Sequence, residues 1–243
     1  MSRPETTAKD EKVGMDDLAE DMFGLNIRGV HTLWALLRKP GDVFAAARKP
    51  DWTDRRYTPS IRLVFSIIAA MAALRFIWSG PESYLFDVTR GLIENRTTFE
   101  SEAALNAFTD DVLDTYVFLF PLVLMAGHAL ASLFLRIWGK GTPLVVRIRL
   151  YFSALVPGTF FSLLSTTLLG VGNEWVWFAY AAGSIVVVFA IDMATAWRGG
   201  VAGIGPVGKG SRALVFAITS FVVAMVTNAL AYTGSSAWVS AFG

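Results

Sequence analysis

Five long stretches of the chain are almost free of charged residues, and shorter polar stretches separate them. Each is about 20 residues long, the length that a helix needs to cross a bilayer core of roughly 30 Å. The apolar positions do not alternate with polar ones, as they would in barrel strands. Because backbone groups in lipid must be paired within the segment, we expect helices. The predicted spans are residues 61–79, 112–138, 150–171, 175–197 and 213–233.

The composition agrees with a membrane protein. Hydrophobic residues make up 54% of the 243 residues and charged residues 17%, whereas soluble chains average about 45–50% and about 25%. The chain has no cysteine, which excludes disulfides, thiolate nucleophiles and cysteine-ligated metal centres. We therefore predict an all-α integral membrane protein. Its transmembrane domain, residues 61–243, is expected to be a bundle of five helices, preceded by a cytoplasmic amphipathic segment.

Lysine and arginine residues are distributed unevenly between the two sides of this bundle. Ten of them precede the first span, whereas the loop 80–111 holds two beside seven acidic residues. The connection after the second span and the loop after the fourth span each hold three, and the tail after residue 233 is uncharged. Because loops rich in Lys and Arg stay in the cytoplasm, we expect the N-terminus inside and the C-terminus outside.

The region before the first span divides into two parts. Residues 1–26 are polar and acidic, which predicts a disordered cytoplasmic tail without a signal peptide. Residues 27–60 form a basic juxtamembrane segment, in which Ile27, Val30 and Trp34 recur at the spacing of a helix. This spacing predicts an amphipathic helix at the inner surface of the membrane.

A Pro40-Gly41 pair is expected to end that helix, and Asp42 is expected to be the N-cap of a second short helical turn. A basic amphipathic segment beside a bilayer binds anionic lipid, at about 1 kcal/mol per basic residue near the surface. Alternatively, the charges only hold the N-terminus inside. The candidate residues for lipid or partner binding are Arg28, Arg38, Lys39, Arg48, Lys49, Arg55 and Arg56.

The loop 80–111 is too long for a simple turn. Apolar residues at helical spacing over residues 99–112 predict that part of this loop lies along the outer interface. The tripeptide at residues 95–97 matches the acceptor pattern for N-glycosylation, which is a short pattern with little specificity.

Ionisable side chains inside the predicted spans are few, and they are candidates for function because a charge in lipid is costly. Arg75 can still insert, since its cost of about 2.5–3.5 kcal/mol is outweighed by roughly 4 to 5 kcal/mol from its apolar neighbours. Together with one neutral amide, the candidates are Arg75, Asp114, His128, Arg136, Asp192 and Asn228.

At a rise of about 1.5 Å per residue, His128 and Asp192 lie at a similar depth in the inner half of the bundle. Such a pair could relay a proton. Alternatively, His128 bonds a neighbouring helix, and Asp192 pairs with Arg136 or faces water beside Arg198.

Two further features concern the helices themselves. Arg75 and Asp114 lie nearer the outer face, on consecutive spans, and are expected to form a structural pair. Pro121 and Pro157 are expected to kink the second and third spans.

The loop 199–210 contains six glycines, and residues 203–211 nearly match the phosphate-binding loop pattern. Gly210 occupies the Ser/Thr position that should bind Mg²⁺, so a flexible inner loop is expected. Haem with two histidine ligands is not expected, because His128 is the only histidine in the spans. We expect no catalytic residues, no metal site, no cofactor, no enzymatic activity and no nucleic-acid partner.

Two short motifs precede and open the first span, residues 36–44 (LLRKPGDVF) and residues 56–63 (RYTPSIRL). They resemble the entry segment of bacterial membrane proteins in the YIP superfamily, five-span proteins named for Ypt/Rab interaction, and in related families of unknown function. The resemblance implies a cytoplasmic N-terminal region followed by five spans in the cytoplasmic (inner) membrane of a bacterium. It implies no catalytic residues.

Three functions are compatible with these patterns. The first is a non-enzymatic membrane protein that organises the membrane or partner proteins through its basic segment. Its partners would be the lipid bilayer, anionic lipids in particular, and other membrane proteins or further copies of itself. The second is a small proton-coupled transporter or channel subunit, an oligomer that uses His128 and Asp192. The third is an accessory subunit of a larger membrane complex.

Overall fold

The computed structural model describes residues 27–49, 56–95, 98–167 and 174–242. The predicted tail at residues 1–26, Arg55, Arg96, Thr97 and the predicted end of the third span lie outside these ranges. The described ranges contain helices and no strand. The helices are α2 (Ile27–Arg38), α3 (Pro40–Ala47), α4 (Ser60–Ile77), α5 (Tyr84–Glu94), α6 (Glu102–Phe134), α7 (Leu144–Thr166), α8 (Glu174–Gly199) and α9 (Gly205–Phe242).

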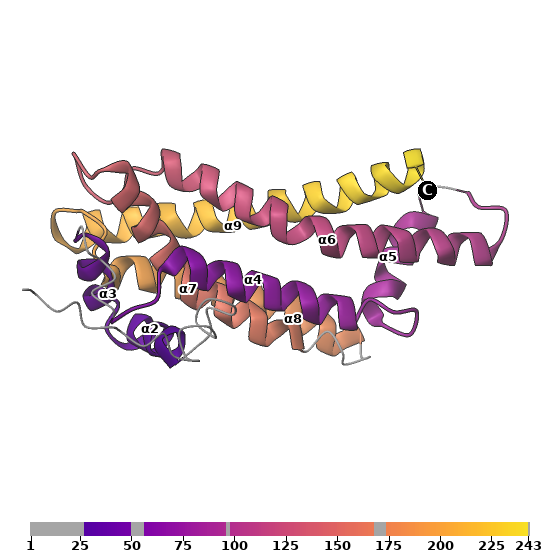
Figure 1. Ribbon diagram of the computed structural model, residues 1–243, viewed down its shortest axis with the longest axis horizontal. Coiled ribbons are helices and arrows are strands. Elements are labelled where there is room, and N and C mark those ends of the chain that lie inside the picture. The colour runs from indigo at the N-terminus through magenta and orange to yellow at the C-terminus, as the bar shows by residue number, and fades with distance from the viewer. Residues whose placement is uncertain (1–26, 50–55, 96–97, 168–173, 243) are drawn as a thin grey trace, which may run out of the picture.

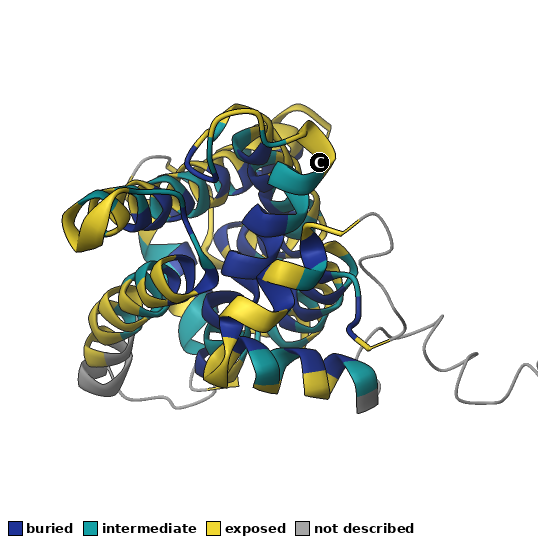
Figure 2. Ribbon diagram, turned by 90° about the vertical axis from the view of Figure 1, so that its left-hand side faces the viewer, coloured by how far each residue is buried: buried dark blue, intermediate teal, exposed yellow. Residues whose placement is uncertain are grey.

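Five of these helices, α4, α6, α7, α8 and α9, are long and apolar enough to cross a membrane. The prediction of an all-helical fold that contains five helices of membrane-spanning length is thereby confirmed for the described residues. Figure 1 shows the five helices side by side in an elongated bundle, with α2 and α3 at one end and α5 at the other. Exposed residues on their outer faces include many large hydrophobic ones, as a lipid-facing surface requires (Figure 2).

The bundle has two layers. Helices α6 and α9 pack along each other, and α7 packs between α4 and α8 in the second layer. Contacts of α4 with α6 and of α8 with α9 join the layers at their edges. Helix α7 is the central element, and residues 150–159 along it are all buried. Pro157 lies inside this helix and does not interrupt it.

The second spanning helix, α6, differs in its ends from the predicted span. It begins at Glu102, where the Ser101 hydroxyl accepts a hydrogen bond from the backbone N–H of Ala104, and it ends at Phe134. Residues 102–112 are therefore the first turns of α6, which confirms the predicted helical spacing from Glu102 onward and makes this stretch continuous with the second long helix. The reason is a continuous buried face that includes Leu105 and Val112.

Helix α5 was not predicted from the sequence. Its N-cap is Ser83, whose hydroxyl accepts from the backbone N–H of Phe86, and its buried residues pack against α6. Arg90 of α5 also lies 3.6 Å from the Glu102 carboxylate. These contacts place α5 beside the N-terminal part of α6.

Helix α9 is longer than the fifth predicted span at both ends. It begins at Gly205, so the second half of the glycine-rich stretch is helical and was wrongly predicted as a flexible loop. Gly200 and Gly205 have positive φ angles of 100° and 70°, which glycine adopts easily, and they lead the chain into α9. The helix continues to Phe242, past the predicted end at residue 233.

Helices α2 and α3 dock on the bundle at the start of α7 and the end of α8. Arg198 donates to the carbonyl oxygen of Leu37 at 3.1 Å and to that of Arg38. These bonds supply donors to carbonyl groups in the last turn of α2, which have no partner within the helix. A Cβ at Gly199 would lie 2.5 Å from the Phe44 ring of α3, so only glycine admits this contact.

The junction between α2 and α3 differs in detail from the prediction. Asp42 was predicted as the N-cap of α3, but the cap position is Lys39 and Pro40 is the first helical residue. Proline is favoured there because its missing N–H is not needed. Asp42 lies in the first turn of α3, where its charge suits the positive end of the helix.

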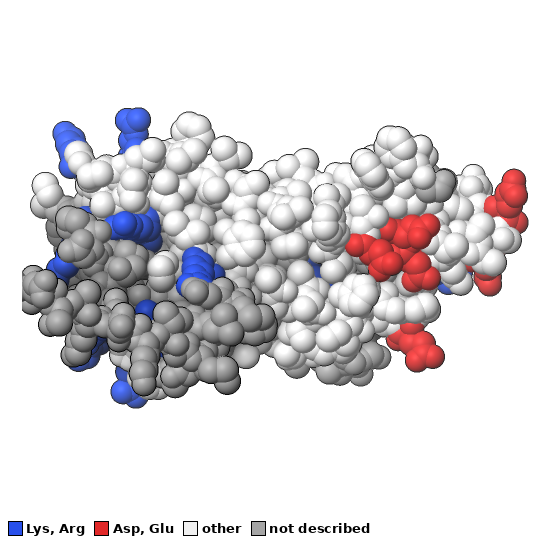
Figure 3. Space-filling view, in the orientation of Figure 1, with Lys and Arg blue, Asp and Glu red and all other residues white. Residues whose placement is uncertain are grey.

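Charged side chains are segregated along the bundle. Figure 3 shows Lys and Arg gathered at the end that carries α2 and α3, and Asp and Glu gathered at the end that carries α5. The face between these ends is almost free of charged side chains in this view. Helices α6 and α9 each run from one charged end to the other (Figure 1).

Candidate functional site

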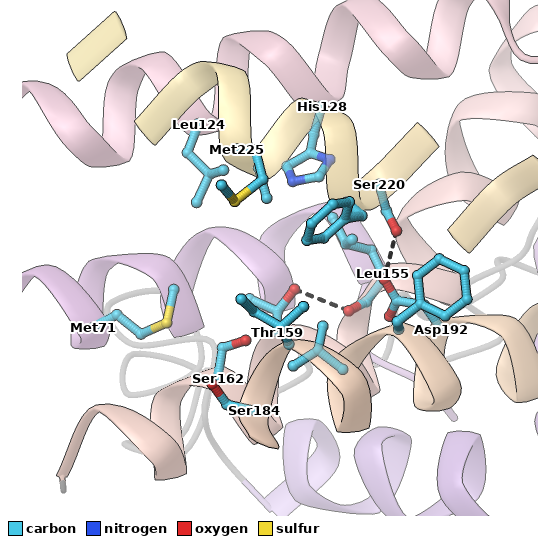
Figure 4. A pocket seen from close by; sticks show the side chains of 15 residues that line it. Met71, Leu124, His128, Leu155, Thr159, Ser162, Ser184, Asp192, Ser220 and Met225 are labelled. Carbon is cyan, nitrogen blue, oxygen red and sulfur yellow. Dashed lines mark hydrogen bonds between the residues drawn. The ribbon is translucent and has the colours of Figure 1, made fainter. Parts of the chain in front are cut away.

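A pocket of about 190 Å³ lies between the two layers of the bundle. Every one of the five long helices contributes to it, as Figure 4 shows. The pocket is lined by Met71 of α4, Leu124 and His128 of α6, Leu155, Thr159 and Ser162 of α7, Ser184, Ile185, Val188, Phe189 and Asp192 of α8, and Ser220, Phe221, Ala224 and Met225 of α9. A single pocket therefore joins segments that are up to 154 residues apart, from residue 71 to residue 225.

Asp192 supplies a carboxylate to this pocket, and it is 2% exposed. Its Oδ2 atom accepts a hydrogen bond of 2.7 Å from the Ser220 hydroxyl. Its Oδ1 atom is buried without a hydrogen-bond partner. Oδ1 lies against Gly158, where a Cβ would sit only 2.1 Å away. The glycine thus admits the carboxylate between α7 and α8.

His128 lines the same pocket from α6 and is buried. Its Nδ1 atom forms a hydrogen bond of 2.8 Å with the Tyr151 hydroxyl of α7. The structure thus brings His128 and Asp192 to one pocket, as their matched depth suggested, but each is bonded to a different partner. A proton relay between them stays a prediction.

Hydroxyl groups in the pocket donate to their own helices. Thr159 donates to the Leu155 carbonyl at 2.9 Å, Ser162 to the Gly158 carbonyl at 3.1 Å, and Ser184 to the Ala181 carbonyl at 3.1 Å. Each hydroxyl has one proton and two lone pairs. With the proton occupied, these oxygens present acceptors to their surroundings.

The remaining lining is apolar, and the pocket is not sealed at its side. Among its lining residues, Ile185 is 44% exposed and Met225 is 50% exposed. Both lie on helices whose outer faces are apolar, α8 and α9. In a membrane, the exposed side of the pocket would therefore meet lipid.

Arg75 has other partners than the predicted one. Its guanidinium donates to the Tyr116 hydroxyl and lies 4.0 Å from the centre of the Phe120 ring. Tyr116 in turn donates to Asn228 Oδ1 at 2.5 Å. Asp114 is exposed, and the predicted Arg75–Asp114 pair is wrong. The Arg75–Tyr116–Asn228 cluster instead joins α4, α6 and α9.

The two alternatives predicted for Asp192, a pair with Arg136 or a position facing water beside Arg198, are also wrong, since Asp192 is 2% exposed. Arg136 is exposed and lies beyond the end of α6 at Phe134, so it is not inside a spanning helix. Arg198 bonds the end of α2 instead. Asp192 has a hydroxyl partner rather than a cation partner among the described residues.

The basic candidates at the other end of the bundle fall into two groups. The first group, Arg48 and Arg28, interacts with other parts of the chain and so also stabilises the fold. Arg48 donates to the Gly200 carbonyl at 3.1 Å, and Arg28 has contacts within the chain. The Arg38 guanidinium lies 4.4 Å from the Trp34 ring centre, and that of Arg56 lies 5.3 Å from the Tyr57 ring centre.

Lys39 and Lys49 are exposed. On α2, which ends next to Lys39, the side chains of Val30, Trp34 and Leu37 are also exposed, with Trp34 at 54%. Apolar and basic side chains thus share the free surface of α2.

Sequence reasoning missed Tyr116, Tyr151 and Ser220 as site residues. Tyrosines and serines are common in membrane helices, so their presence alone gave no signal. The one available signal was spacing, because Ser220 and Ala224 lie four residues apart on one face of α9.

The described residues contain no group of three or more His, Asp or Glu side chains placed to hold a metal ion. No family model matches the chain, and comparisons with curated proteins and with solved structures find no match.

Proposed function

We propose that the protein is a small, non-enzymatic membrane transporter that carries a solute through the pocket between its helix layers, coupled to protons. The observation that carries this proposal is the pocket itself, lined by all five membrane-length helices around the buried Asp192 carboxylate. A carboxylate inside a membrane is costly and is typical of solute and proton pathways. Ligand sites between the helices of a bundle are also common.

The roles follow from the contacts. Asp192 is the proton-binding and solute-binding group, since its Oδ1 atom has no partner within the described chain. His128 is the second proton-binding group, held through Tyr151. Ser220 positions the Asp192 carboxylate through its hydrogen bond to Oδ2.

The test is uptake into liposomes that contain the purified protein and a trapped pH dye. Alanine, glucose and choline represent zwitterionic, neutral and cationic solutes, and a proton gradient drives the assay. We expect uptake of one class together with proton movement, and its loss in Asp192→Asn and His128→Gln. Asp114→Asn is the matched control, because that carboxylate is exposed outside the pocket. Equal uptake by the wild type and Asp192→Asn would refute the proposal.

The proposed orientation places α2 and α3 in the bacterial cytoplasm and α5 outside. The segregated charges support it, because basic ends of membrane proteins stay inside. The chain has no cysteine, so single cysteines introduced at Lys49 and Asn106 report the sides cleanly. A membrane-impermeant thiol reagent added to intact cells should label the second and not the first. The reverse pattern would overturn the orientation.

We also propose that the free surface of α2 binds anionic lipid. The supporting observation is that Val30, Trp34 and Leu37 are exposed next to exposed Lys39. Such a surface inserts its apolar side chains at the interface, while its basic ones attract lipid headgroups. The first YIP-like motif, residues 36–44, begins in the last turn of this helix, and membrane organisation through α2 is compatible with transport.

This second proposal is tested with full-length protein in nanodiscs of mixed phosphatidylcholine and phosphatidylglycerol. Native mass spectrometry should detect retained phosphatidylglycerol, and Lys39→Gln with Lys49→Gln should reduce it. Arg48→Gln is not suitable, because Arg48 also bonds the Gly200 carbonyl. The control is Lys209→Gln, a neutralised exposed lysine elsewhere on the basic end. Equal retention by the double variant and this control would count against lipid binding by α2.

A further inference from the structure

The pocket offers hydrogen-bond acceptors and almost no free donors. The protons of Thr159, Ser162 and Ser184 are used by carbonyls of their own helices, and that of Ser220 is used by Asp192 Oδ2 or the Ala217 carbonyl. Apart from the His128 ring, the polar side chains of the lining thus present oxygen lone pairs. A ligand that fits this pattern must donate hydrogen bonds.

The pocket also holds a carboxyl group without a cation partner. Among the described residues, no Lys, Arg or His forms an ion pair with Asp192, whose Oδ1 atom lacks any partner. A charged carboxylate buried without a cation is strongly disfavoured, and either a proton or a bound cation removes that cost. A ligand that takes the place of the proton is therefore positively charged as well as a donor.

The size and lining of the pocket select the kind of cation. About 190 Å³ is far more than a single metal ion needs, yet less than the roughly 300–1,000 Å³ of sites for drug-sized ligands. Most of the lining is apolar, including Leu124, Leu155 and Val188. An inorganic cation would gain nothing from these walls, whereas an alkyl chain would be buried against them.

We propose that the pocket binds a small organic ammonium, with the N–H groups at Asp192 and the apolar body between α6 and α7. This inference rests on the proposed transport function in one respect, because the ligand that it names would be the transported solute. The open side of the pocket at Ile185 and Met225 gives such an amphiphilic molecule access from the lipid phase.

The experiment is isothermal calorimetry with the full chain in nanodiscs, titrated with n-butylammonium chloride, 1-butanol and sodium butyrate. Empty nanodiscs give the background for partitioning into lipid. We expect saturable binding of butylammonium, at least tenfold weaker in Asp192→Asn and unchanged in Asp114→Asn. Neither butanol nor butyrate should show binding that depends on Asp192. Equal affinities of butylammonium for the wild type and Asp192→Asn, or no saturable binding, would overturn the proposal.

A second measurement needs no variant and so does not depend on the folding of Asp192→Asn. The thermal unfolding midpoint of the wild type should rise with butylammonium, because a ligand that binds only the folded state stabilises it. It should not rise with equal concentrations of butanol or sodium chloride. A rise with sodium chloride equal to that with butylammonium would identify the site as an inorganic cation site and reject the organic ligand.

The two proposals fail separately. If butylammonium binds but uptake does not depend on Asp192, the ligand class stands and transport is wrong. If uptake depends on Asp192 but butylammonium does not bind, transport stands and the ligand class is wrong.

Discussion

Replacing Gly158 with alanine tests the contact between α7 and α8 on which the pocket depends. The new Cβ would lie 2.1 Å from Asp192 Oδ1 and 3.0 Å from its carboxyl carbon. Ordinary contacts are about 3.4 Å or longer, so the carboxylate must move by more than 1 Å. That movement stretches or breaks the bond between Oδ2 and Ser220.

The magnitude follows from two opposing effects. Overpacking a filled interior costs about 1–3 kcal/mol, while alanine in place of glycine inside a helix gains about 1 kcal/mol. We expect Gly158→Ala to lower the free energy of unfolding by about 0–2 kcal/mol. In an Asp192→Ala background the clash is gone, and the same substitution should raise it by about 1 kcal/mol. The coupling between the two positions is therefore about 1–3 kcal/mol.

The assay is reversible unfolding in mixed micelles, followed by circular dichroism as the fraction of sodium dodecyl sulfate increases. Gly183→Ala is the matched control, because it lies on α8 with nothing within 4 Å of the added Cβ. This control should be neutral or slightly stabilising. If Gly158→Ala behaves like Gly183→Ala, or if the coupling is below about 0.5 kcal/mol, α7 and α8 do not meet at Asp192 as described.

Three more substitutions test neighbouring contacts. Gly127→Ala places a Cβ 2.4 Å from the Thr227 methyl group between α6 and α9, so unfolding in the same micelles should become easier, and Thr227→Ser should restore stability. Tyr116→Phe removes the hydroxyl that joins Arg75 to Asn228, with an expected loss of about 1 kcal/mol in that assay. Gly199→Ala should displace the Phe44 ring, so amides of α3 should exchange hydrogen faster in mass spectrometry; unchanged exchange would contradict the docking.

The spans could be predicted because length and absence of charge are properties of the sequence alone. The ends of the helices could not, since they depend on caps and on neighbours. Ser101 begins α6 well before the apolar run, and Ser83 begins a helix that has no long apolar run at all. In both cases the packing of α5 against α6 stabilises a helix in a stretch that is rich in polar residues.

The sequence predicted how far along the helices the site residues lie, but not which side of each helix they occupy. Counting residues placed His128 and Asp192 at one level, because the rise per residue is nearly constant, and both line one pocket. The same counting paired Arg75 with Asp114. Two residues along α6 amount to about 200° of rotation, so Tyr116 faces the bundle while Asp114 is exposed. Only the packed structure decides that rotation.

Transport through the pocket requires the side chains at each of its two ends to move. On one side, Met71 and Ala224 of the lining lie four residues before Arg75 and Asn228, so the cluster with Tyr116 lies one helical turn away. This side is closed by side chains from three helices.

On the other side, Tyr151 and Phe216 lie four residues before Leu155 and Ser220 of the lining, and their rings are 5.3 Å apart. Trp138 packs on Phe216 and connects these rings to α3. Within one turn of the pocket, a hydrogen-bonded cluster thus lies towards the end that carries α5, and aromatic packing lies towards the end that carries α2 and α3. A binding site can function in this state, but a transporter must open the two ends in turn, and for this reason solute flux rather than ligand binding decides the function.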